Sequence, residues 1–395
     1  MFKNNPQGVK VLLSASLLNL FLGMIYIWGI FVVPVSEALS WNPDAAKLTA
    51  SFLIGFFTWG NVLAGRLLPK LGASKVTRLG GAIMAIGAVL AALTPQSAPW
   101  LLYVTYGILV GLGGGMGYIV AVAGVQKWFP NHRGTATGIC VGIFGLSVTV
   151  FAPILSFLLR EFSVQITFFI LAAVFLCVTF LLGQFMHFPK ENQAPPSAMD
   201  DKRQYSPREM VKTRAFVHII ASFFLVTVAF FVVNPAVQTL SLYRGFPLEF
   251  ATRLLMITGI ANTAGRFIVP MLSGKMRNET IIVCLMAVLT FAAGMLTFAT
   301  GALFVVVVTL IPICFGAALS VFPLLTADYF GLKNLAANYG LVGLGFSASA
   351  LLAPGAIGLL GGYTTRFIAV AVLSALGICT MGSLLLQARG AQKKK

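Results

Sequence analysis

The chain has 395 residues, of which 58% are hydrophobic and only 9% are charged, and its mean hydropathy is +0.93. A water-soluble globular protein of this length does not have such a composition. The net charge of +17 could indicate a nucleic-acid-binding protein, but the distribution of the basic residues along the chain argues against it.

Apolar runs of about 20 residues or more recur along the chain, and a helix of that length crosses a bilayer core of about 30 Å. The sequence therefore predicts an all-α polytopic membrane protein. We place its twelve spans at residues 9–36, 45–68, 76–95, 99–125, 134–159, 164–187, 216–242, 249–273, 280–300, 302–327, 337–362 and 365–386. The first run is too long for the core of a signal peptide, so we expect it to remain as an uncleaved span.

Lys and Arg are distributed unevenly around these spans. With the N-terminus in the cytoplasm, they gather in cytoplasmic segments; the exceptions are Arg266, within a span, and Lys47, Arg160, Arg244, Arg253 and Arg366, on the outside. Such a bias sets the orientation of membrane proteins. We therefore expect both termini in the cytoplasm, and we expect basic segments such as Lys393–Lys395 to lie near anionic lipid rather than nucleic acid.

The cysteines show no pattern of a reactive or metal-binding set. All five, namely Cys140, Cys177, Cys284, Cys314 and Cys379, lie within predicted spans. Their spacing matches no metal site and none lies in a loop where a disulfide would form, so we expect small apolar packing residues. We expect neither a metal nor a cofactor.

One long polar stretch, from Pro189 to about Thr213, divides the spans six and six. Its composition is that of a linker, with a short amphipathic helix around Ser206–Thr213. We predict an N-terminal six-helix bundle at 1–188, a cytoplasmic linker at 189–214 and a C-terminal six-helix bundle with a basic cytoplasmic tail at 215–395. This layout resembles that of the major facilitator superfamily.

A loop in each half resembles the superfamily's loop signature of glycine, leucine, aspartate and basic residues. Residues 65–72 read GRLLPKLG, and residues 270–277 read PMLSGKMR. Pro69 and Gly274 stand where the aspartate of the signature usually lies. Because that aspartate helps to lock one conformation, we expect the energetics of gating to differ here. The candidate gating residues of the first loop are Gly65, Arg66, Lys70 and Gly72.

The segments after the fourth and tenth spans also echo each other. In each, two aromatic residues precede a basic residue, which is Arg133 in the first segment and Lys333 in the second. We regard both as candidate gating residues. Asp328, at the cytoplasmic end of the tenth span, belongs to the same group, and we expect it to have a structural role near Lys333.

Arg266 lies inside an apolar stretch, residues 250–273, that is long enough to cross a bilayer. The next basic residue, Lys275, is about 13 Å further along a helix, and a guanidinium can snorkel over only part of that distance. A charge at such depth costs about 2.5–3.5 kcal/mol and usually faces a polar cavity or a partner. No carboxylate in the sequence is placed to be that partner. We therefore expect Arg266 to bind an external anion; the alternative is an arginine bonded to carbonyl groups of a broken helix.

Three segments resemble the oxalate/formate antiporter family, whose members are related to monocarboxylate transporters within the superfamily. The first, at residues 26–31, reads YIWGIF; the second, at 127–138, reads KWFPNHRGTATG; the third and most specific, at 322–334, reads FPLLTADYFGLKN and is followed by NYG at 338–340. The resemblance covers nearly the whole chain. It implies the major facilitator superfamily fold, with twelve transmembrane helices in two six-helix halves, in the inner membrane of a bacterium.

The resemblance also implies roles for three residues. In this family an arginine of the eighth span binds the substrate carboxylate, and Arg266 matches it. Proton-coupled monocarboxylate carriers have an aspartate one turn before this arginine, where this chain has Asn262. Members that move oxalate have a lysine in the eleventh span, where this chain has Phe346. The first difference removes a proton acceptor, and the second removes the additional positive charge that a dianion needs.

Three aromatic residues complete the candidate substrate-binding set. Tyr26 and Trp28 in the first span and Tyr118 in the fourth belong to helices that line the cavity in this fold. For each, packing within the bundle is the alternative. A buried tyrosine hydroxyl needs a hydrogen-bond partner, which favours a site role for Tyr26 and Tyr118.

We expect a secondary transporter for a small monocarboxylate such as formate, lactate or pyruvate, working by alternating access and anion exchange. The alternatives are a proton-coupled symporter, an oxalate/formate exchanger, a carrier for another small solute and a sensor that does not transport. An enzyme is disfavoured because all ten carboxylates lie at span ends or in loops. The expected partners are a small carboxylate and the lipid bilayer, with no nucleic acid, and we expect a monomer.

Overall fold

The computed structural model describes residues 5–190, 193, 199 and 203–393, and every regular element in this part of the chain is a helix. Eleven of the described helices are long and apolar enough to cross a membrane. The predicted all-α membrane fold is confirmed. Two predicted features, the linker residues 200–202 and the last residues of the basic tail, lie outside the described residues.

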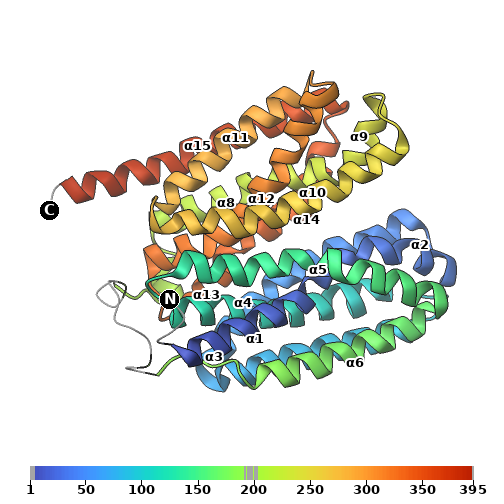
Figure 1. The fold of residues 1–395 in the computed structure, drawn as a ribbon, viewed down its shortest axis with the longest axis horizontal. Coiled ribbons are helices and arrows are strands. Elements are labelled where there is room, and N and C mark those ends of the chain that lie inside the picture. Colours follow the sequence, from blue (N-terminus) through green and yellow to red (C-terminus); the bar gives the residue numbers. More distant parts are fainter. Residues whose placement is uncertain (1–4, 191–192, 194–198, 200–202, 394–395) are drawn as a thin grey trace.

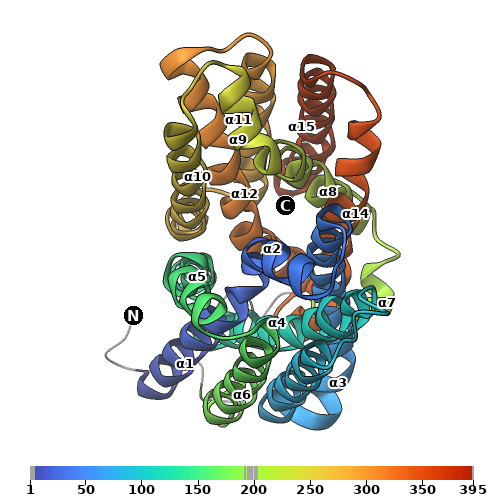
Figure 2. The ribbon, with the colours of Figure 1, turned by 90° about the vertical axis from the view of Figure 1, so that its right-hand side faces the viewer.

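The helices form two groups, which pack side by side (Figures 1 and 2). The N-terminal bundle contains α1 (Pro6–Leu22), η1 (Gly23–Ile27), α2 (Trp28–Ala38), α3 (Pro43–Ala92), η2 (Tyr103–Val110), α4 (Gly111–Trp128), α5 (Arg133–Glu161) and α6 (Val164–Gly183). The C-terminal bundle contains α8 (Arg214–Val233), η3 (Asn234–Ala236), α9 (Val237–Tyr243), α10 (Leu248–Ile268), η4 (Val269–Gly274), α11 (Asn278–Leu296), α12 (Gly301–Phe330), α13 (Leu335–Val342), α14 (Leu344–Gly358) and α15 (Tyr363–Lys393). Between them lies the short linker helix α7 (Pro207–Met210).

Helix α3 accounts for two of the twelve predicted spans. Its 50 residues would extend over about 75 Å, more than twice the thickness of a bilayer core. The chain reverses at Gly72, whose φ of 78° and ψ of 165° are conformations that only glycine adopts readily. The predicted second and third spans are therefore the two arms of one helical hairpin.

The first span of each bundle is interrupted by a short turn of 3₁₀-helix. In the N-terminal bundle, η1 separates α1 from α2, and in the C-terminal bundle, η3 separates α8 from α9. A 3₁₀ turn inside a longer helix changes the direction of the side chains and often marks a functional site. Here η1 carries Tyr26, one of the predicted substrate-binding residues.

The start of α1, the end of α15 and α7 all lie at one end of the molecule, which we call the linker end (left in Figure 1). Close packing joins the bundles there. A Cβ atom at Gly65 in α3 would overlap Ala337 in α13, and one at Gly134 in α5 would overlap the carbonyl oxygen of Pro270 in η4. Glycine at these two positions thus permits backbones from opposite bundles to touch.

Polar contacts also join the bundles at the linker end. An Nη2 atom of Arg133 lies 2.7 Å from a carboxylate oxygen of Asp328, and both side chains are largely buried. Within the C-terminal bundle, the Asn278 side-chain amide donates to the other oxygen of Asp328 at 2.6 Å. The Lys127 ammonium donates to the backbone carbonyl of Lys333 at 3.1 Å. We expected Asp328 to have a structural role near Lys333. In the structure its carboxylate forms an ion pair with Arg133 of the other bundle.

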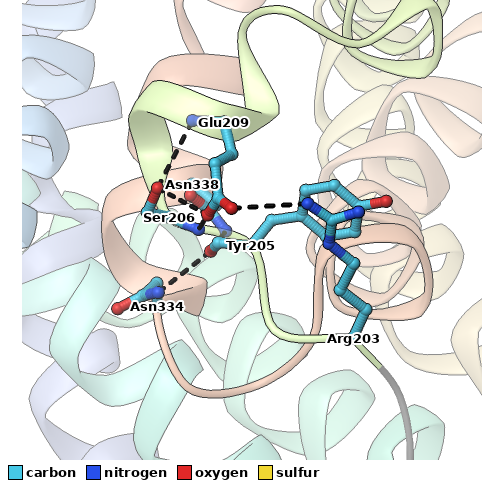
Figure 3. A network of polar contacts seen from close by, with 6 residues as sticks. All are labelled: Arg203, Tyr205, Ser206, Glu209, Asn334 and Asn338. Carbon is cyan, nitrogen blue, oxygen red and sulfur yellow. Dashed lines mark hydrogen bonds and ion pairs between the residues drawn. The ribbon is translucent and has the colours of Figure 1, made fainter.

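The linker is attached to the C-terminal bundle at the turn between α12 and α13 (Figure 3). The backbone carbonyl of Tyr205 accepts hydrogen bonds from Asn334 at 2.9 Å and from Asn338 at 3.1 Å. Ser206 and Glu209 then form a capping box that begins α7. The helix predicted around 206–213 is present but shorter, because regular helix covers only four residues.

Candidate functional site

Arg266 is almost fully buried, with 1% of its surface exposed. Its position is fixed by close packing of α10 against α12. Cβ atoms at Gly265 and Gly316 would overlap the carbonyl oxygens of Ile313 and Asn262, respectively, so only glycine permits this approach. The Ser320 hydroxyl of α12 donates to the carbonyl oxygen of Arg266 at 3.1 Å.

The guanidinium of Arg266 is only partly satisfied. Its Nε atom donates to the Oδ1 atom of Asn262, one helical turn earlier, at 3.1 Å. Its Nη2 atom is buried and has no hydrogen-bond partner among the described residues, and no described carboxylate forms an ion pair with it. Leaving a buried charged donor unpaired is costly. The group is therefore free to receive an anion.

Aromatic rings from the other bundle face this charge. The guanidinium carbon lies 5.5 Å from the ring centroid of Tyr26 and 5.2 Å from that of Phe144. Both distances are within the range of cation–π attraction, which is stronger when the pair is desolvated. These rings offset part of the cost of burying the cation, but they do not supply a negative charge.

Arg266 lines a cavity between the two bundles. The residues that line it are Tyr26, Phe57, Thr58, Asn61, Tyr118 and Phe144 from the N-terminal bundle, and Phe223, Arg266, Leu319, Tyr339, Gly343 and Phe346 from the C-terminal bundle. Seven of these twelve residues are aromatic, and Arg266 is the only one that carries a charge. Small-molecule sites commonly combine apolar walls with a few placed polar groups in this way.

The neutral polar groups of the cavity can orient a ligand bound to the arginine. Tyr118 from the N-terminal bundle and Tyr339 from the C-terminal bundle both bring a hydroxyl group to the residues that line the cavity. The Oδ1 atom of Asn61 is buried and has no partner among the described residues. A ligand with one anionic group and a second polar group could therefore bind Arg266 and still find hydrogen-bond partners.

Most of the sequence-predicted substrate-binding residues come together here. Tyr26, Tyr118, Arg266 and Phe346 line the cavity. Asn262 lies behind the arginine and orients it.

Trp28 lies elsewhere in the fold. Its indole N–H donates to the carbonyl oxygen of Ala46 at 2.8 Å, and its ring stacks with Phe31 and Phe168 inside the N-terminal bundle. Its predicted contact with substrate is therefore replaced by a packing role. The reason is the direction of the chain after η1, which turns Trp28 away from the cavity.

Phe346 forms an apolar wall of the cavity rather than a polar one. Its ring centroid lies 5.9 Å from that of Phe223, 5.5 Å from that of Phe231 and 6.1 Å from that of Phe315. Aromatic side chains packed together in this way exclude water. This part of the cavity therefore suits an alkyl group better than a charge.

Sequence reasoning missed several lining residues, which are Phe57, Thr58, Asn61, Phe144, Phe223, Leu319, Tyr339 and Gly343. Tyr339 lies in a segment that resembles the antiporter family, which is a usable signal. The phenylalanines give no such signal, because 33 phenylalanines occur in the chain and most of them only pack.

The predicted gating residues lie at the linker end. Gly65 and Gly72 shape α3 as described above, and Arg133 and Asp328 pair across the bundles. Lys70 is exposed. Arg66 is also exposed and lines a second groove.

Known proteins resemble this chain over nearly its full length. The pattern of the Major Facilitator Superfamily matches residues 12–327. The "Uncharacterized MFS-type transporter YhjX" of Escherichia coli (strain K12) is 26% identical over 360 residues, which are 89% of this chain and 88% of that protein. The "Oxalate:formate antiporter" of Oxalobacter formigenes is 23% identical over 389 residues, 94% of this chain and 92% of that protein. Monocarboxylate transporter 12 of Mus musculus is 24% identical, covering 78% of this chain and 70% of its own.

Solved transporters share the fold at low identity. The crystal structure of the transporter FucP in the outward conformation has a TM-score of 0.70 and 17% identity, covering 94% of this chain and 97% of FucP. The proton:xylose symporter XylE also has a TM-score of 0.70, with 15% identity and 95% of each chain covered. These relatives are transporters rather than enzymes. With the family pattern matched over most of its length, the chain belongs to the major facilitator superfamily.

Proposed function

We propose that this protein is a secondary transporter that exchanges small monocarboxylates across the bacterial inner membrane by alternating access of its two bundles. The observation that carries the proposal is that Arg266 lines the cavity while its buried Nη2 atom has no partner among the described residues. A guanidinium presents a planar set of N–H donors that matches a carboxylate. The similarity to an oxalate:formate antiporter and to monocarboxylate transporters supports the same class of substrate.

A single negative charge fits the cavity best. Among the described residues that line it, Arg266 alone is charged, and Phe346 supplies an apolar wall. A second carboxylate would be desolvated without a partner. The substrate class we propose is therefore a monocarboxylate with a hydrogen or a short alkyl chain.

We assign the linker end to the cytoplasm. The positive-inside distribution of Lys and Arg supports this orientation. The close glycine contacts and the Arg133–Asp328 ion pair would then hold the cytoplasmic side closed.

We expect obligatory exchange with little dependence on pH. No Asp, Glu or His is among the residues that line the cavity, so no side chain there changes its charge between pH 5 and 8. An empty cavity leaves Arg266 uncompensated, which disfavours the return of the empty transporter. In proteoliposomes, uptake of labelled formate, lactate or pyruvate should require an internal carboxylate. It should change less than about threefold from pH 5.5 to 7.5 once the ionised fraction of the substrate is taken into account.

Protein-free liposomes and Arg266→Gln proteoliposomes provide the background. Accumulation driven by a proton gradient, without internal carboxylate and abolished in Asn262→Ala, would identify a proton symporter instead. Saturable uptake of a sugar or another uncharged solute, unaffected by carboxylates, would place the chain with the other carriers of its superfamily.

The Arg133–Asp328 ion pair gives a test of the proposed orientation. Asp328→Asn should move the conformational equilibrium toward the inward-open state by about tenfold, because the charged partner of Arg133 is lost from the closed side, whereas the contact of Asp328 with Asn278 lies within one bundle. The measurement is the distance between spin labels at Lys70 and Lys275, one in each bundle, with a longer distance expected in the variant.

Glu249→Gln is the matched control, since it breaks an exposed ion pair with Arg253 that lies within one bundle. Exchanging the charges in Arg133→Asp/Asp328→Arg should restore part of the short distance. A label distance that is the same in wild type and Asp328→Asn would contradict the assignment of this pair to the cytoplasmic closure.

A further inference from the structure

A second groove lies at the linker end, on the seam between the bundles. It contains about 1050 Å³ of empty space and is open to the surroundings. Three separate elements form it. Its lining residues are Val62 and Arg66 from α3, Ser206, Pro207, Arg208 and Val211 from the linker around α7, and Ala337 and Leu341 from α13.

The groove has an unneutralised positive rim. Arg66 and Arg208 are exposed, and no described carboxylate forms an ion pair with either. Glu209 is next to Arg208 in sequence, but its carboxylate binds the backbone N–H and the hydroxyl of Ser206 at 2.8 and 2.7 Å. A hydrogen bond from the Ser206 backbone N–H also holds the pKa of Glu209 below its ordinary value. The rim therefore keeps the positive charge of two guanidinium groups.

Apart from Ser206, the other lining residues of the groove are apolar, and with the proposed orientation Val62 and Leu341 lie on the membrane side of the arginines. Val62 is one turn deeper in the second span than Arg66, and Leu341 is one turn further along α13 than Ala337. Val211 adds an apolar side chain that is 41% exposed. A soluble anion gains nothing by contact with such an apolar wall, whereas a lipid acyl chain can pack against it.

We propose that this groove binds the headgroup of one anionic phospholipid of the cytoplasmic leaflet, with its phosphate between Arg66 and Arg208 and the start of an acyl chain along Val62 and Leu341. The inference goes beyond the proposed substrate and rests only on the proposed orientation of the linker end. Two guanidinium groups match a phosphodiester, and basic pockets between membrane helices are known to select anionic headgroups.

The linker is held in place for this contact. Hydrogen bonds from Asn334 and Asn338 to the Tyr205 carbonyl attach it to the start of α13 (Figure 3). The Tyr205 N–H also donates to the carbonyl of Phe330 at 3.0 Å. Arg208 is thus presented by the C-terminal bundle, while Arg66 belongs to the N-terminal bundle. A lipid bound to both connects the bundles on their closed side.

Native mass spectrometry of the full-length protein tests the proposal. Phosphatidylglycerol and phosphatidylcholine with identical acyl chains are titrated against wild type and Arg66→Gln/Arg208→Gln. Wild type should retain one phosphatidylglycerol in preference to phosphatidylcholine. The double variant should bind phosphatidylglycerol about thirtyfold more weakly, because it loses the attraction of two arginines to the anionic lipid. Val211→Trp, which fills the groove without changing its charge, should also weaken binding.

Lys10→Gln/Lys75→Gln is the matched control, because both side chains are exposed at the same end, outside the groove. It should bind phosphatidylglycerol as wild type does. The proposal is overturned if the control loses as much binding as the double variant, if the double variant binds like wild type, or if phosphatidylcholine binds equally well. Competition by free glycerol phosphate at the same concentration would show a site for soluble anions and would also overturn it. None of these measurements depends on transport, so a failure here is distinct from a failure of the proposed substrate.

Discussion

Arg266→Gln should reduce monocarboxylate exchange by about a hundredfold or more while the protein still inserts and folds. The transported anion would lose its only positively charged partner in the cavity, and the loss of such a buried contact costs several kcal/mol, or about a factor of ten for each 1.4 kcal/mol. Folding should survive because Arg266 forms no ion pair with a described carboxylate, so the substitution leaves no opposite charge unpaired. Counterflow in proteoliposomes measures the exchange, and size-exclusion chromatography with circular dichroism measures the folded state.

Two further variants sharpen this test. Arg253→Gln removes a positive charge from the same helix at an exposed position and should transport normally. Arg266→Lys keeps the charge but not the planar set of donors, and should transport poorly. Uptake at the wild-type rate by a folded Arg266→Gln protein would show that Arg266 does not bind the substrate. It would also contradict the proposal of a monocarboxylate substrate.

Monocarboxylates should bind at least about a hundredfold more tightly than oxalate. The cavity offers one cation, and the second charge of a dianion would be buried against Phe346 and its aromatic neighbours at a cost of several kcal/mol. Phe346→Lys should reverse this preference by weakening monocarboxylate binding and admitting oxalate. Inhibition of labelled lactate exchange by oxalate measures the preference for monocarboxylates in the wild type and in Phe346→Lys.

Phe346→Leu is the control, because it shortens the side chain without adding a charge. It should keep the preference for monocarboxylates. Oxalate that competes equally well in the wild type would mean that the charge of the dianion is balanced by groups other than Arg266.

The sequence predicts the fold of this protein well because bilayer thickness imposes a length on every span. The twelve apolar runs and the charge bias follow from that constraint. What it predicts less well is where a span is interrupted. The turn η3 begins with Asn234 and Pro235, and a proline inside a span is a local signal of a helix break, whereas η1 contains no proline. The hairpin at Gly72 is an exception, since a glycine-bearing loop at residues 65–72 is visible in the sequence.

The candidate site was predictable to the extent that its chemistry is rare. Arg266 stands out because a buried charge in a span has few explanations. Trp28 shows the limit of the same reasoning. It lies only two residues from Tyr26, but a change of helix type between them places the tyrosine at the cavity and the tryptophan inside the bundle. Side-chain direction at such a break depends on tertiary contacts that local sequence does not encode.

The contact of the Tyr26 and Phe144 rings with Arg266 affects how substrate binding changes the relative motion of the two bundles. Both belong to the N-terminal bundle, whereas the guanidinium that they face belongs to the C-terminal bundle. In the empty cavity the cation therefore acts as an electrostatic tether between the bundles. A carboxylate at Nη2 cancels much of the charge to which the rings respond, and so it weakens this tether when it arrives. Binding of the substrate therefore makes it easier for the two bundles to move relative to each other. In the empty protein, the attraction between the bundles remains.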